Sequence, residues 1–242
     1  DTITGTWDTI CSSGPAPTVT AGGGGDSSAT AYDRSGNSND GTLTGDPTPD
    51  RGIIGQALRF DGSDDYVDLS AYPTNGSLDK EVTLAAWIKT GSGGVIFGKR
   101  NDWTTANDFT FDIVSGAAGT RVDWGNSGSI LSYQSNDSSL LDDEWHHVVV
   151  VVDSSLAVET ERVKFYHDGL YVGTTGTPSG GGALSQDDTL DLNDSIDLAI
   201  GARRINVGGE SFFNGLIDDP RIYNRALSAS EVMQLYKLGA RE

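Results

Sequence analysis

The sequence predicts an all-β fold in which two antiparallel sheets pack face to face, with one short helix near the C-terminal end. Short apolar alternations recur along the chain, and Gly, Ser, Thr, Asp and Asn fill the segments between them, a rhythm typical of strands joined by turns. About a dozen such strands exceed what one open sheet holds without curling or splitting, so two packed sheets are expected. One stretch near the C-terminal end carries helix signals instead.

Each predicted strand is a run of alternating or continuous apolar residues bounded by turn residues. The tightest connection is the hairpin "YHDGLYV", where Asp168 and Gly169 form the corner, because Asp-Gly is typical of a type I′ turn. The expected strands cover residues 56–60, 66–69, 82–89, 94–98, 109–114, 120–124, 129–133, 146–153, 162–169, 170–175, 196–201 and 215–223.

The predicted helix is "SASEVMQLYKLG". Ser228 occupies the N-cap, and Glu231 three residues later completes a capping box. Gly239 is expected to end the helix. The residues that share its apolar face are Val232, Leu235 and Tyr236. We expect this face to dock on a sheet edge or to close one end of the sandwich.

The chain is strongly acidic, with 35 acidic against 16 basic residues and a formal net charge of −19. Nucleic-acid binding needs a basic patch, so this composition argues against a nucleic-acid partner and against an anionic membrane surface. No run of about 18 apolar residues is present, so no segment is expected to insert into a bilayer. Asp outnumbers Glu by 28 to 7, which places the acid in turns and leaves two explanations open: several cation sites, or solubility in a saline habitat.

A chain of 242 residues suits one large β domain or two small ones. Its single cysteine, Cys11, has no internal partner for a disulfide, and no Cys/His spacing of a zinc site occurs. The sequence begins "DTITGTWDT" without a signal-peptide pattern. We therefore expect a processed chain or a segment of something longer.

Six segments occur in an order that is specific when they are taken together. They are "DRSGNSNDGTLTG", "GIIGQALRFDGSDDYVDL", "VTLAAWIK", "DEWHHVVVVVD", "VKFYHDGLYVG" and "FFNGLIDDPRIYNRALSASEVMQLY". The set spans roughly residues 28–238. It resembles the bacterial laminin-G-like domains of the concanavalin A-like lectin/glucanase superfamily.

The resemblance implies a jelly-roll sandwich and a single domain over residues 1–242, with residues 11–31 as a loop insert. It also implies a structural calcium ion and a non-catalytic carbohydrate-binding or adhesive module of a larger secreted protein. Two features depart from the family pattern. Trp7 in "GTWDTI" matches the family's first strand but precedes the insert, and Pro220 removes a backbone donor from the last strand. We therefore expect that strand to be an edge or to contain a bulge.

The loop "YDRSGNSNDG", residues 32–41, concentrates side-chain oxygen and has little apolar surface. Calcium takes about six to eight oxygen ligands from carboxylates, amides, backbone carbonyls and waters. The candidate ligands here are Asp33, Asn37, Asn39, Asp40 and the backbone at Gly41. The loop lacks EF-hand spacing, so a distant ligand is needed. The resemblance points to the last strand, "LIDDPRIY", and we expect its Asp218 to complete the site.

Hydrogen bonding offers an alternative to the calcium site. Asp33 and Asp40 would then cap turns, and Asp218 would pair with an arginine such as Arg221. A second acidic group is expected to be a solvated hairpin loop. It consists of Asp61, Asp64 and Asp65.

The sequence lacks the E-x-D-x-x-E pattern of sandwich glycosidases, whose chemistry needs two closely spaced carboxyl groups. Glu159 and Glu161 lie in a polar stretch and are expected to be solvated. We expect His146 and His147 to be structural, one packed and one facing out, and His167 to lie on the surface. We therefore predict that the chain is not an enzyme. A polysaccharide lyase or hydrolase with an unfamiliar site is the alternative.

Two tryptophans are expected outside the core. Trp103 lies in the polar stretch "KRNDWTTAND", and Trp124 ends "TRVDWGNSG". Exposed indole rings stack on sugars while nearby polar groups bind hydroxyls; alternatively, each ring covers a loop or the end of the sandwich. The candidate glycan contacts are Asn101, Asp102, Trp103, Asp123 and Trp124. Arg203 and Arg204 are expected either to meet acidic sugars or to offset nearby Asp.

These features together predict a non-catalytic, calcium-stabilised domain that binds a polysaccharide or glycan. The expected location is extracellular or at the cell surface. A structural or assembly unit of a surface or filament protein, with a protein partner, is the alternative.

Overall fold

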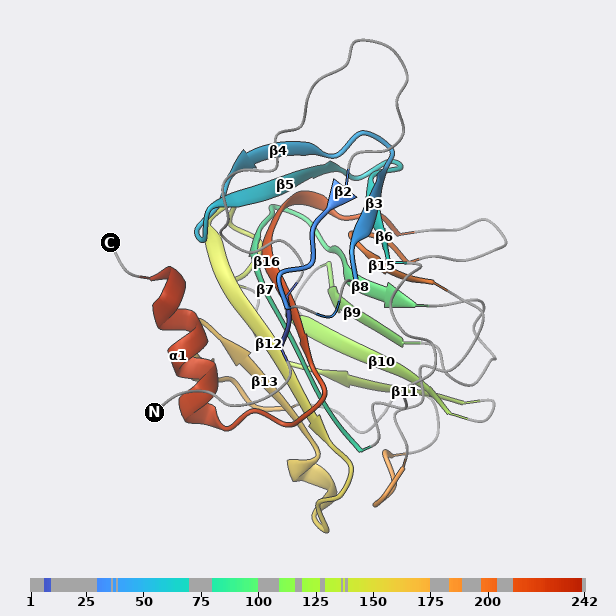
Figure 1. Cartoon of the computed structure of the whole chain (residues 1–242). Coiled ribbons are helices and arrows are strands. Elements are labelled where there is room, and N and C mark those ends of the chain that lie inside the picture. Colours follow the sequence, from blue (N-terminus) through green and yellow to red (C-terminus); the bar gives the residue numbers. More distant parts are fainter. Residues whose placement is uncertain are drawn as a thin grey trace.

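A computed structural model describes most of the chain as two packed β-sheets with one helix against them (Figure 1). The described residues are 7–9 (backbone), 30–35, 37, 39–69, 80–99, 109–115, 119–126, 129–135, 137, 139–174, 183–188, 197–203 and 211–240. This arrangement confirms the predicted all-β sandwich of two antiparallel sheets with one short C-terminal helix.

The first sheet has the strand order β14-β13-β12-β7-β16-β5-β4, and β1 pairs with β16 beside this path. Its strands are β1 (Trp7–Thr9), β4 (Thr48–Arg51), β5 (Gln56–Asp61), β7 (Glu81–Lys89), β12 (Trp145–Asp153), β13 (Val163–His167), β14 (Leu170–Tyr171) and β16 (Asn214–Tyr223). β16 is the long inner strand, with β7 along one side and both β5 and β1 along the other. The expected strand around Trp7 therefore forms, paired with the last strand.

The second sheet has the order β11-β10-β9-β8-β15-β6-β3-β2. Its strands are β2 (Thr30–Ala31), β3 (Gly41–Thr44), β6 (Tyr66–Leu69), β8 (Gly94–Lys99), β9 (Phe109–Ile113), β10 (Thr120–Asn126), β11 (Ser129–Gln134) and β15 (Leu198–Ile200). The chain passes between the sheets at the β3–β4 and β5–β6 connections. These two connections lie together at the candidate site described below.

The core lies between the sheets because the inner faces of both carry large apolar side chains. Its largest fully buried members include Phe60, Phe97, Phe109, Phe111, Phe165 and Phe213. The Asp168–Gly169 corner of the β13–β14 hairpin has positive φ at both residues, 50° and 78°. These values confirm the predicted I′-type turn.

Helix α1 (Ala229–Gly239) covers the outer face of the first sheet (Figure 1). Ser228 and Glu231 form the predicted capping box. Val232 and Leu235 pack with a second apolar cluster that includes Val149 of β12. The expectation that the helix docks on an edge or closes an end is wrong, because the outward side chains of β7 and β12 are apolar and need a cover.

β16 contains the predicted irregularity at Pro220. Its pairing with β7 shifts register between Asp218 and Arg221, and Asp219 has a φ of 47°. The bulge alternative is therefore confirmed, whereas the edge alternative is wrong because β16 is paired on both sides. In the described ranges, no helix is long and apolar enough to cross a membrane.

Candidate functional site

A groove runs beside strands β5 and β16, where the two connections between the sheets meet. We call it the Arg59 groove. Its main part has a volume of about 510 Å³, and a narrower part of about 280 Å³ shares Arg59 and Asn214 with it. The main part is lined by Gly45, Asp46, Thr48, Arg59, Phe60, Asp61, Asp64, Asp65 and Asn214. Asn214 faces Asp61 directly across the β16–β5 ladder.

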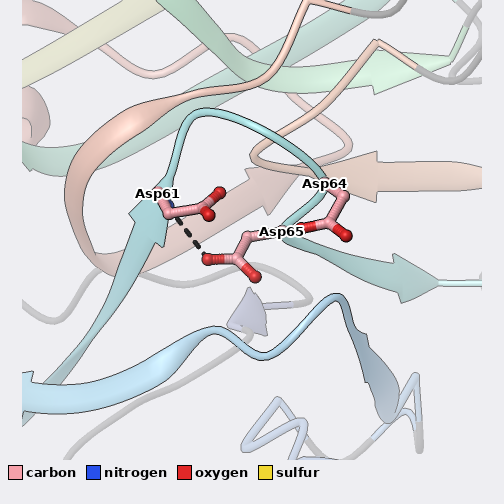
Figure 2. Close-up of side chains that lie close together, drawn as sticks. All are labelled: Asp61, Asp64 and Asp65. Atoms are coloured by element: carbon pink, nitrogen blue, oxygen red, sulfur yellow. Dashed lines mark hydrogen bonds between the residues drawn. The ribbon is translucent and has the colours of Figure 1, made fainter.

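Three carboxylates form the acidic wall of the groove (Figure 2): Asp61, Asp64 and Asp65 each offer an oxygen within 4.8 Å of the others. Asp65 is buried, and its two oxygens accept hydrogen bonds from the backbone nitrogens of Asp46 at 2.7 Å and Asp61 at 2.9 Å. Asp65 thus ties the β3–β4 connection to the β5–β6 connection. Burial, followed by the nearby carboxylates, raises the pKa of Asp65.

The predicted hairpin at this acidic group is wrong, because β5 and β6 belong to different sheets. Asp61 and Asp64 are nevertheless exposed, as expected for a solvated loop. The Asp61 side chain accepts a hydrogen bond from the backbone nitrogen of Ser63 at 2.7 Å. This hydrogen bond and those to Asp65 give the loop a defined shape.

The lining also includes a basic side chain, Arg59. Arg59 donates from Nη2 at 2.6 Å and from Nε at 3.2 Å to one oxygen of Asp50, and the hydrogen bonds from Arg59 lower the pKa of that carboxyl. Lys89 and Asp143 line the narrower part. Asp143 has a φ of 62° and packs against Gly91. The groove therefore presents carboxylate, amide and guanidinium groups, the kinds that hydrogen-bond a polyhydroxylated ligand.

The opening loop, by contrast, is hydrogen-bonded to itself. Asp33 accepts from the backbone nitrogen of Ser35 at 2.7 Å and from that of Asn39 at 2.9 Å, and Ser35 Oγ donates to it at 2.7 Å. Asp40 accepts from the backbone nitrogen of Asp33 at 2.8 Å. Asn37 is exposed, and Gly41 begins β3. This is the turn-capping arrangement that the sequence left open as an alternative.

The predicted distant ligand, Asp218, lies elsewhere. Its neighbour Ile217 packs in the core between the sheets, so Asp218 points to the other face of the first sheet, beside Gly52. Two oxygens on one calcium ion lie within about 5 Å of each other, given ligand distances of about 2.3–2.6 Å. Among the residues that the structure describes, Asp33, Asp40 and Asp218 form no such group of three. The structure therefore does not gather these three acids into one such group, and the calcium site stays a prediction.

The predicted pairing of Asp218 with Arg221 is also wrong. Arg221 Nε donates to Asp219 at 2.7 Å instead, while Asp218 Oδ2 accepts from the backbone nitrogen of Ile54 at 2.7 Å. The bulge explains why Arg221 pairs with Asp219 and not with Asp218. It interrupts the regular alternation of side chains between Asp218 and Arg221.

Of the predicted glycan contacts, Asn101, Asp102 and Trp103 lie outside the described residues. Trp124 is only 5% exposed and stacks on Phe109 with 5.5 Å between ring centroids. The expectation of an exposed ring there is wrong, because β10 continues to Asn126 and its alternation turns Trp124 into the core.

Asp123 points to the opposite side of β10, into a buried charged network. Arg121 Nε lies 3.5 Å from Asp123 and 3.1 Å from Asp112, and its Nη2 donates to Asp112 at 2.5 Å. Arg203 Nη2 also reaches Asp112, at 3.4 Å. Burial raises the pKa of Asp112. These contacts favour the expectation that Arg203 offsets nearby Asp; Arg204 lies outside the described residues.

Asp112 and Arg121 were not predicted as part of a site. The period-two alternation in "FTFDIV" and "TRVDW" could have indicated them, because it places Asp112, Arg121 and Asp123 on one face. Only the pairing of Arg121 with Asp112 in the β9–β10 ladder shows that they meet.

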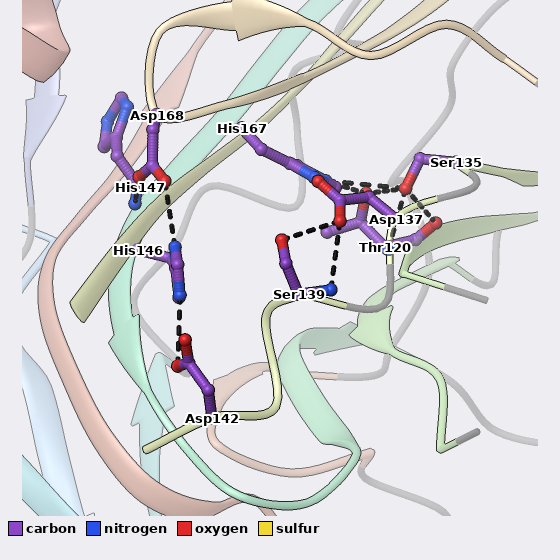
Figure 3. A network of polar contacts seen from close by, with 9 residues as sticks. All are labelled: Thr120, Ser135, Asp137, Ser139, Asp142, His146, His147, His167 and Asp168. Carbon is purple, nitrogen blue, oxygen red and sulfur yellow. Dashed lines mark hydrogen bonds and ion pairs between the residues drawn. The ribbon is translucent and has the colours of Figure 1, made fainter. Parts of the chain in front are cut away.

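The histidines form a polar network at one end of the sandwich (Figure 3). The prediction that His167 lies on the surface is wrong, since it is 4% exposed. Its Nδ1 lies 2.9 Å from Asp137 Oδ2, and its Nε2 lies 2.9 Å from Thr120 Oγ1 and 3.4 Å from Ser135 Oγ. Thr120 and Ser135 have no exposed surface, so this acid–histidine–hydroxyl set joins the two sheets and offers no access to a substrate.

His146 and His147 follow the expected division into one outward and one packed ring. His147 is 3% exposed, lies 5.1 Å from the Trp87 ring and 6.3 Å from the Tyr236 ring, and its pKa is lowered to about 3 by burial. His146 is half-buried and lies between two carboxylates: Nδ1 is 2.9 Å from Asp168 and Nε2 is 3.2 Å from Asp142.

Solved structures share this fold at low sequence identity. Domain 4 of AbnA, a GH43 extracellular arabinanase from Geobacillus stearothermophilus in complex with arabinotriose, has a TM-score of 0.60 and 22% identity, over 85% of this chain and 92% of that one. A botulinum neurotoxin type C structure, titled for cell entry through two ganglioside molecules, has a TM-score of 0.63 and 14% identity, over 98% and 52%.

Sequence comparison gives a relative and a family. The Danio rerio adhesion G-protein coupled receptor V1 is 29% identical over 104 residues, which are 43% of this chain and 1% of that protein. The chain thus spans about a hundredth of the length of that relative. The Laminin_G_3 family model, described as the concanavalin A-like lectin/glucanases superfamily, matches residues 61–233. With its two antiparallel sheets and this match over most of its length, the chain belongs to the concanavalin A-like lectin/glucanases superfamily as a laminin-G-like domain.

Proposed function

We propose that the domain is a non-catalytic module that binds a glycan in the Arg59 groove, as part of a larger secreted or surface protein. The observation that carries this proposal is the groove itself. Its volume of about 510 Å³ falls within the range of about 300–1,000 Å³ typical of ligand sites, and seven of its nine lining residues are polar.

The roles follow from the donor and acceptor chemistry of the lining. Asn214 offers both an amide donor and an acceptor, Arg59 offers donors, and Asp61 and Asp64 accept from sugar hydroxyls. Phe60 also lines the groove but is only 1% exposed, so recognition would rest on hydrogen bonds rather than on ring stacking.

The domains with a similar fold support binding rather than catalysis, since one is in complex with arabinotriose and others are named as binding domains. The buried acid of the groove, Asp65, is committed to two backbone nitrogens. A lyase or hydrolase would need an acid that is free to exchange a proton with the sugar.

A matched pair of variants tests the site. Asn214→Ala removes a groove amide, whereas Asn224→Ala changes an exposed amide after the end of β16, away from the lining. We expect affinity electrophoresis on plant and marine polysaccharides, and calorimetry with arabinotriose, to show binding that Asn214→Ala weakens about tenfold and Asn224→Ala leaves intact. Absence of binding across the panel, or equal loss in both variants, would contradict the proposal.

Adhesion through a protein partner is the second candidate function, and the similarity to an adhesion receptor favours it. A glycan panel without any binder, together with saturable binding to a surface protein that survives glycosidase treatment of that protein, would favour this second function. Release of products from the polysaccharides would instead favour an enzyme.

We also propose that calcium stabilises the opening loop. Asp33, Asn37, Asn39, Asp40 and the backbone at Gly41 offer oxygens, and Asp33 Oδ1, which accepts one hydrogen bond, keeps a second lone pair for a metal. Asp218 is left out of this set because of its place on the other face. We expect calcium to raise Tm, a chelator to reverse the rise, and Asp33→Asn to abolish it while Asp153→Asn, at another Asx turn, does not. An unchanged Tm would contradict the proposal.

A further inference from the structure

His146 joins two loops that are remote in sequence (Figure 3). Its Nδ1 lies 2.9 Å from Asp168 Oδ2 in the β13–β14 turn, and its Nε2 lies 3.2 Å from Asp142 Oδ1 in the β11–β12 connection. We call these three residues the His146 clip. The Asp168 side chain also accepts from the backbone nitrogen of His147 at 2.9 Å, so one end of the clip is fixed to β12.

The geometry requires a specific protonation state. An ionised carboxylate is only an acceptor, so both ring nitrogens of His146 must donate for both contacts to be hydrogen bonds. Only the imidazolium has two N–H groups. When the ring loses a proton, one of the two contacts loses its donor. The Asp142 contact is the weaker of the two, since it is longer and the Asp142 side chain is 50% exposed against 35% for Asp168.

The clip is connected to the Arg59 groove through the chain. Asp142 precedes Asp143, which lines the narrower part of the groove beside Lys89 and Gly91. The Asp143 backbone nitrogen donates to the Thr90 carbonyl at 3.2 Å, and the Glu144 backbone nitrogen donates to Asp142 Oδ1 at 2.9 Å. One oxygen of Asp142 therefore holds both the segment 142–144, whose Asp143 forms part of the groove wall, and the histidine.

The charged surroundings of His146 favour its protonated form. Besides Asp168 and Asp142, the titratable neighbours are His147 beside it and His167 next to Asp168, and both of these have lowered pKa values because they are buried. The residue opposite it on β7, Ile88, is apolar. The hydrogen bond that His146 donates to Asp168 raises the pKa of His146, and hydrogen bonding lowers the pKa values of both partner carboxyls.

We propose that His146 is a pH-dependent clip that holds residues 142–144 in place as a wall of the Arg59 groove when it is protonated, and loosens that wall when it is neutral. A group with a raised folded-state pKa stabilises the fold below its unfolded pKa and loses this effect as pH rises through the folded value. The wall is therefore ordered in mildly acidic solution and more mobile in alkaline solution. Its effect on a glycan ligand rests on the function proposed above.

The test measures the order of residues 142–144 directly and needs no ligand. Imidazole NMR titration, and amide exchange of Glu144 corrected for intrinsic rates, are measured from about pH 5.5 to about pH 9. In the unaltered chain we expect Glu144 protection to fall about threefold to tenfold as His146 titrates. In His146→Gln this pH-dependent fall in Glu144 protection should be absent. Asp142→Asn, at an exposed site, should lower the pKa of His146.

Asp153→Asn is the matched control, because Asp153 also accepts from the backbone nitrogen two residues on but lies outside the clip. This variant should show the same fall in Glu144 protection as the unaltered chain. A fall that persists in His146→Gln, or a measured His146 pKa below that of a free histidine, would overturn the proposal. A second arm measures arabinotriose affinity at both ends of the range. If arabinotriose fails to bind at either pH, the groove proposal loses support while the exchange arm still decides the clip.

Discussion

Asp218 and Ile54 are joined by a hydrogen bond at 2.7 Å across 164 positions of sequence, from the backbone nitrogen of Ile54 to Oδ2 of Asp218. The carboxylate is wholly buried, and burial raises its pKa. It holds the β4–β5 turn against the outer face of β16. An acid that the sequence suggested as a metal ligand thus has a structural partner of its own.

Replacement of Asp218 should therefore destabilise the fold. Asp218→Ala leaves the partly buried Ile54 nitrogen without its acceptor, which costs about 1–3 kcal/mol of unfolding free energy. Asp218→Asn keeps an acceptor oxygen and should cost less than half of that. Chemical denaturation measures both. The control is Asp50→Asn, since the Asp50–Arg59 pair is exposed and such pairs contribute about 1 kcal/mol or less. Equal losses at the two sites would contradict this view of Asp218.

Gly239 should not tolerate a larger residue. A Cβ there would lie 2.5 Å from Ile53 Cγ2 and 2.6 Å from Trp87 Cζ2, so the end of helix α1 would have to shift. We expect Gly239→Ala to destabilise by about 1–3 kcal/mol, measured as a lower denaturation midpoint with an unchanged slope. Lys237→Ala, exposed on the same turn, should change stability by about 0.5 kcal/mol or less. A stabilised Gly239→Ala variant would refute the close packing.

His147 should make stability fall in mild acid. Its folded-state pKa of about 3 lies below the unfolded value of about 6.5, so the unfolded chain binds a proton there that the folded chain does not. Between about pH 6.5 and pH 3 this residue should remove about 1.4 kcal/mol per pH unit.

The window from about pH 4.5 to about pH 6 lies above the range in which Asp137 and Glu231, with pKa values lowered to about 2, contribute their losses. Asp219, with a pKa raised to about 6, and His167, with a lowered pKa, also contribute in this window, so the difference between the unaltered chain and a His147 variant is what reports His147. Unfolding free energies of the unaltered chain and of His147→Gln are compared there, and the variant should show the shallower slope. Identical slopes would mean that His147 is protonated in the folded state.

The buried network at Asp112 should be sensitive to the loss of one partner. Asp112→Ala leaves Arg121 and Arg203 without their shared carboxylate, and breaking a buried ion pair costs about 3–5 kcal/mol. Lys80→Gln is the comparison, because the Lys80–Asp187 pair is largely exposed and should cost about 1 kcal/mol or less. Calorimetric Tm values would distinguish the two, and a small effect at Asp112 would contradict its role.

Local features were predictable from the sequence. The Asp168–Gly169 corner and the Ser228–Glu231 capping box depend on residues within a few positions of each other, and both form as expected. The long apolar strands, such as residues 146–153, also match because burial on both faces needs a continuous apolar run. The family resemblance added the jelly-roll sandwich, which propensity alone does not specify.

Features that depend on distant partners were not predictable. β3 and β4, the latter with Pro49, were not among the expected strands, and they form strands because β6 and β5 pair with them. The face of Trp124 depends on how far β10 extends, and the pairing of Arg221 with Asp219 depends on a bulge. The burial of His167 needs Asp137 and Thr120 from other elements. The groove was not predictable because it forms only where the β3–β4 and β5–β6 connections meet at Asp65.

The position of β16 has a consequence for how the chain reaches its native state. Residues 214–223 fill the space between β7 and the two strands β5 and β1, so the first sheet closes only after synthesis has passed residue 223. Such long-range pairing is slow, because much loop entropy is lost before the contacts form. Until then the edges of β5 and β7 remain open to other chains, and we expect refolding yield to fall as protein concentration rises.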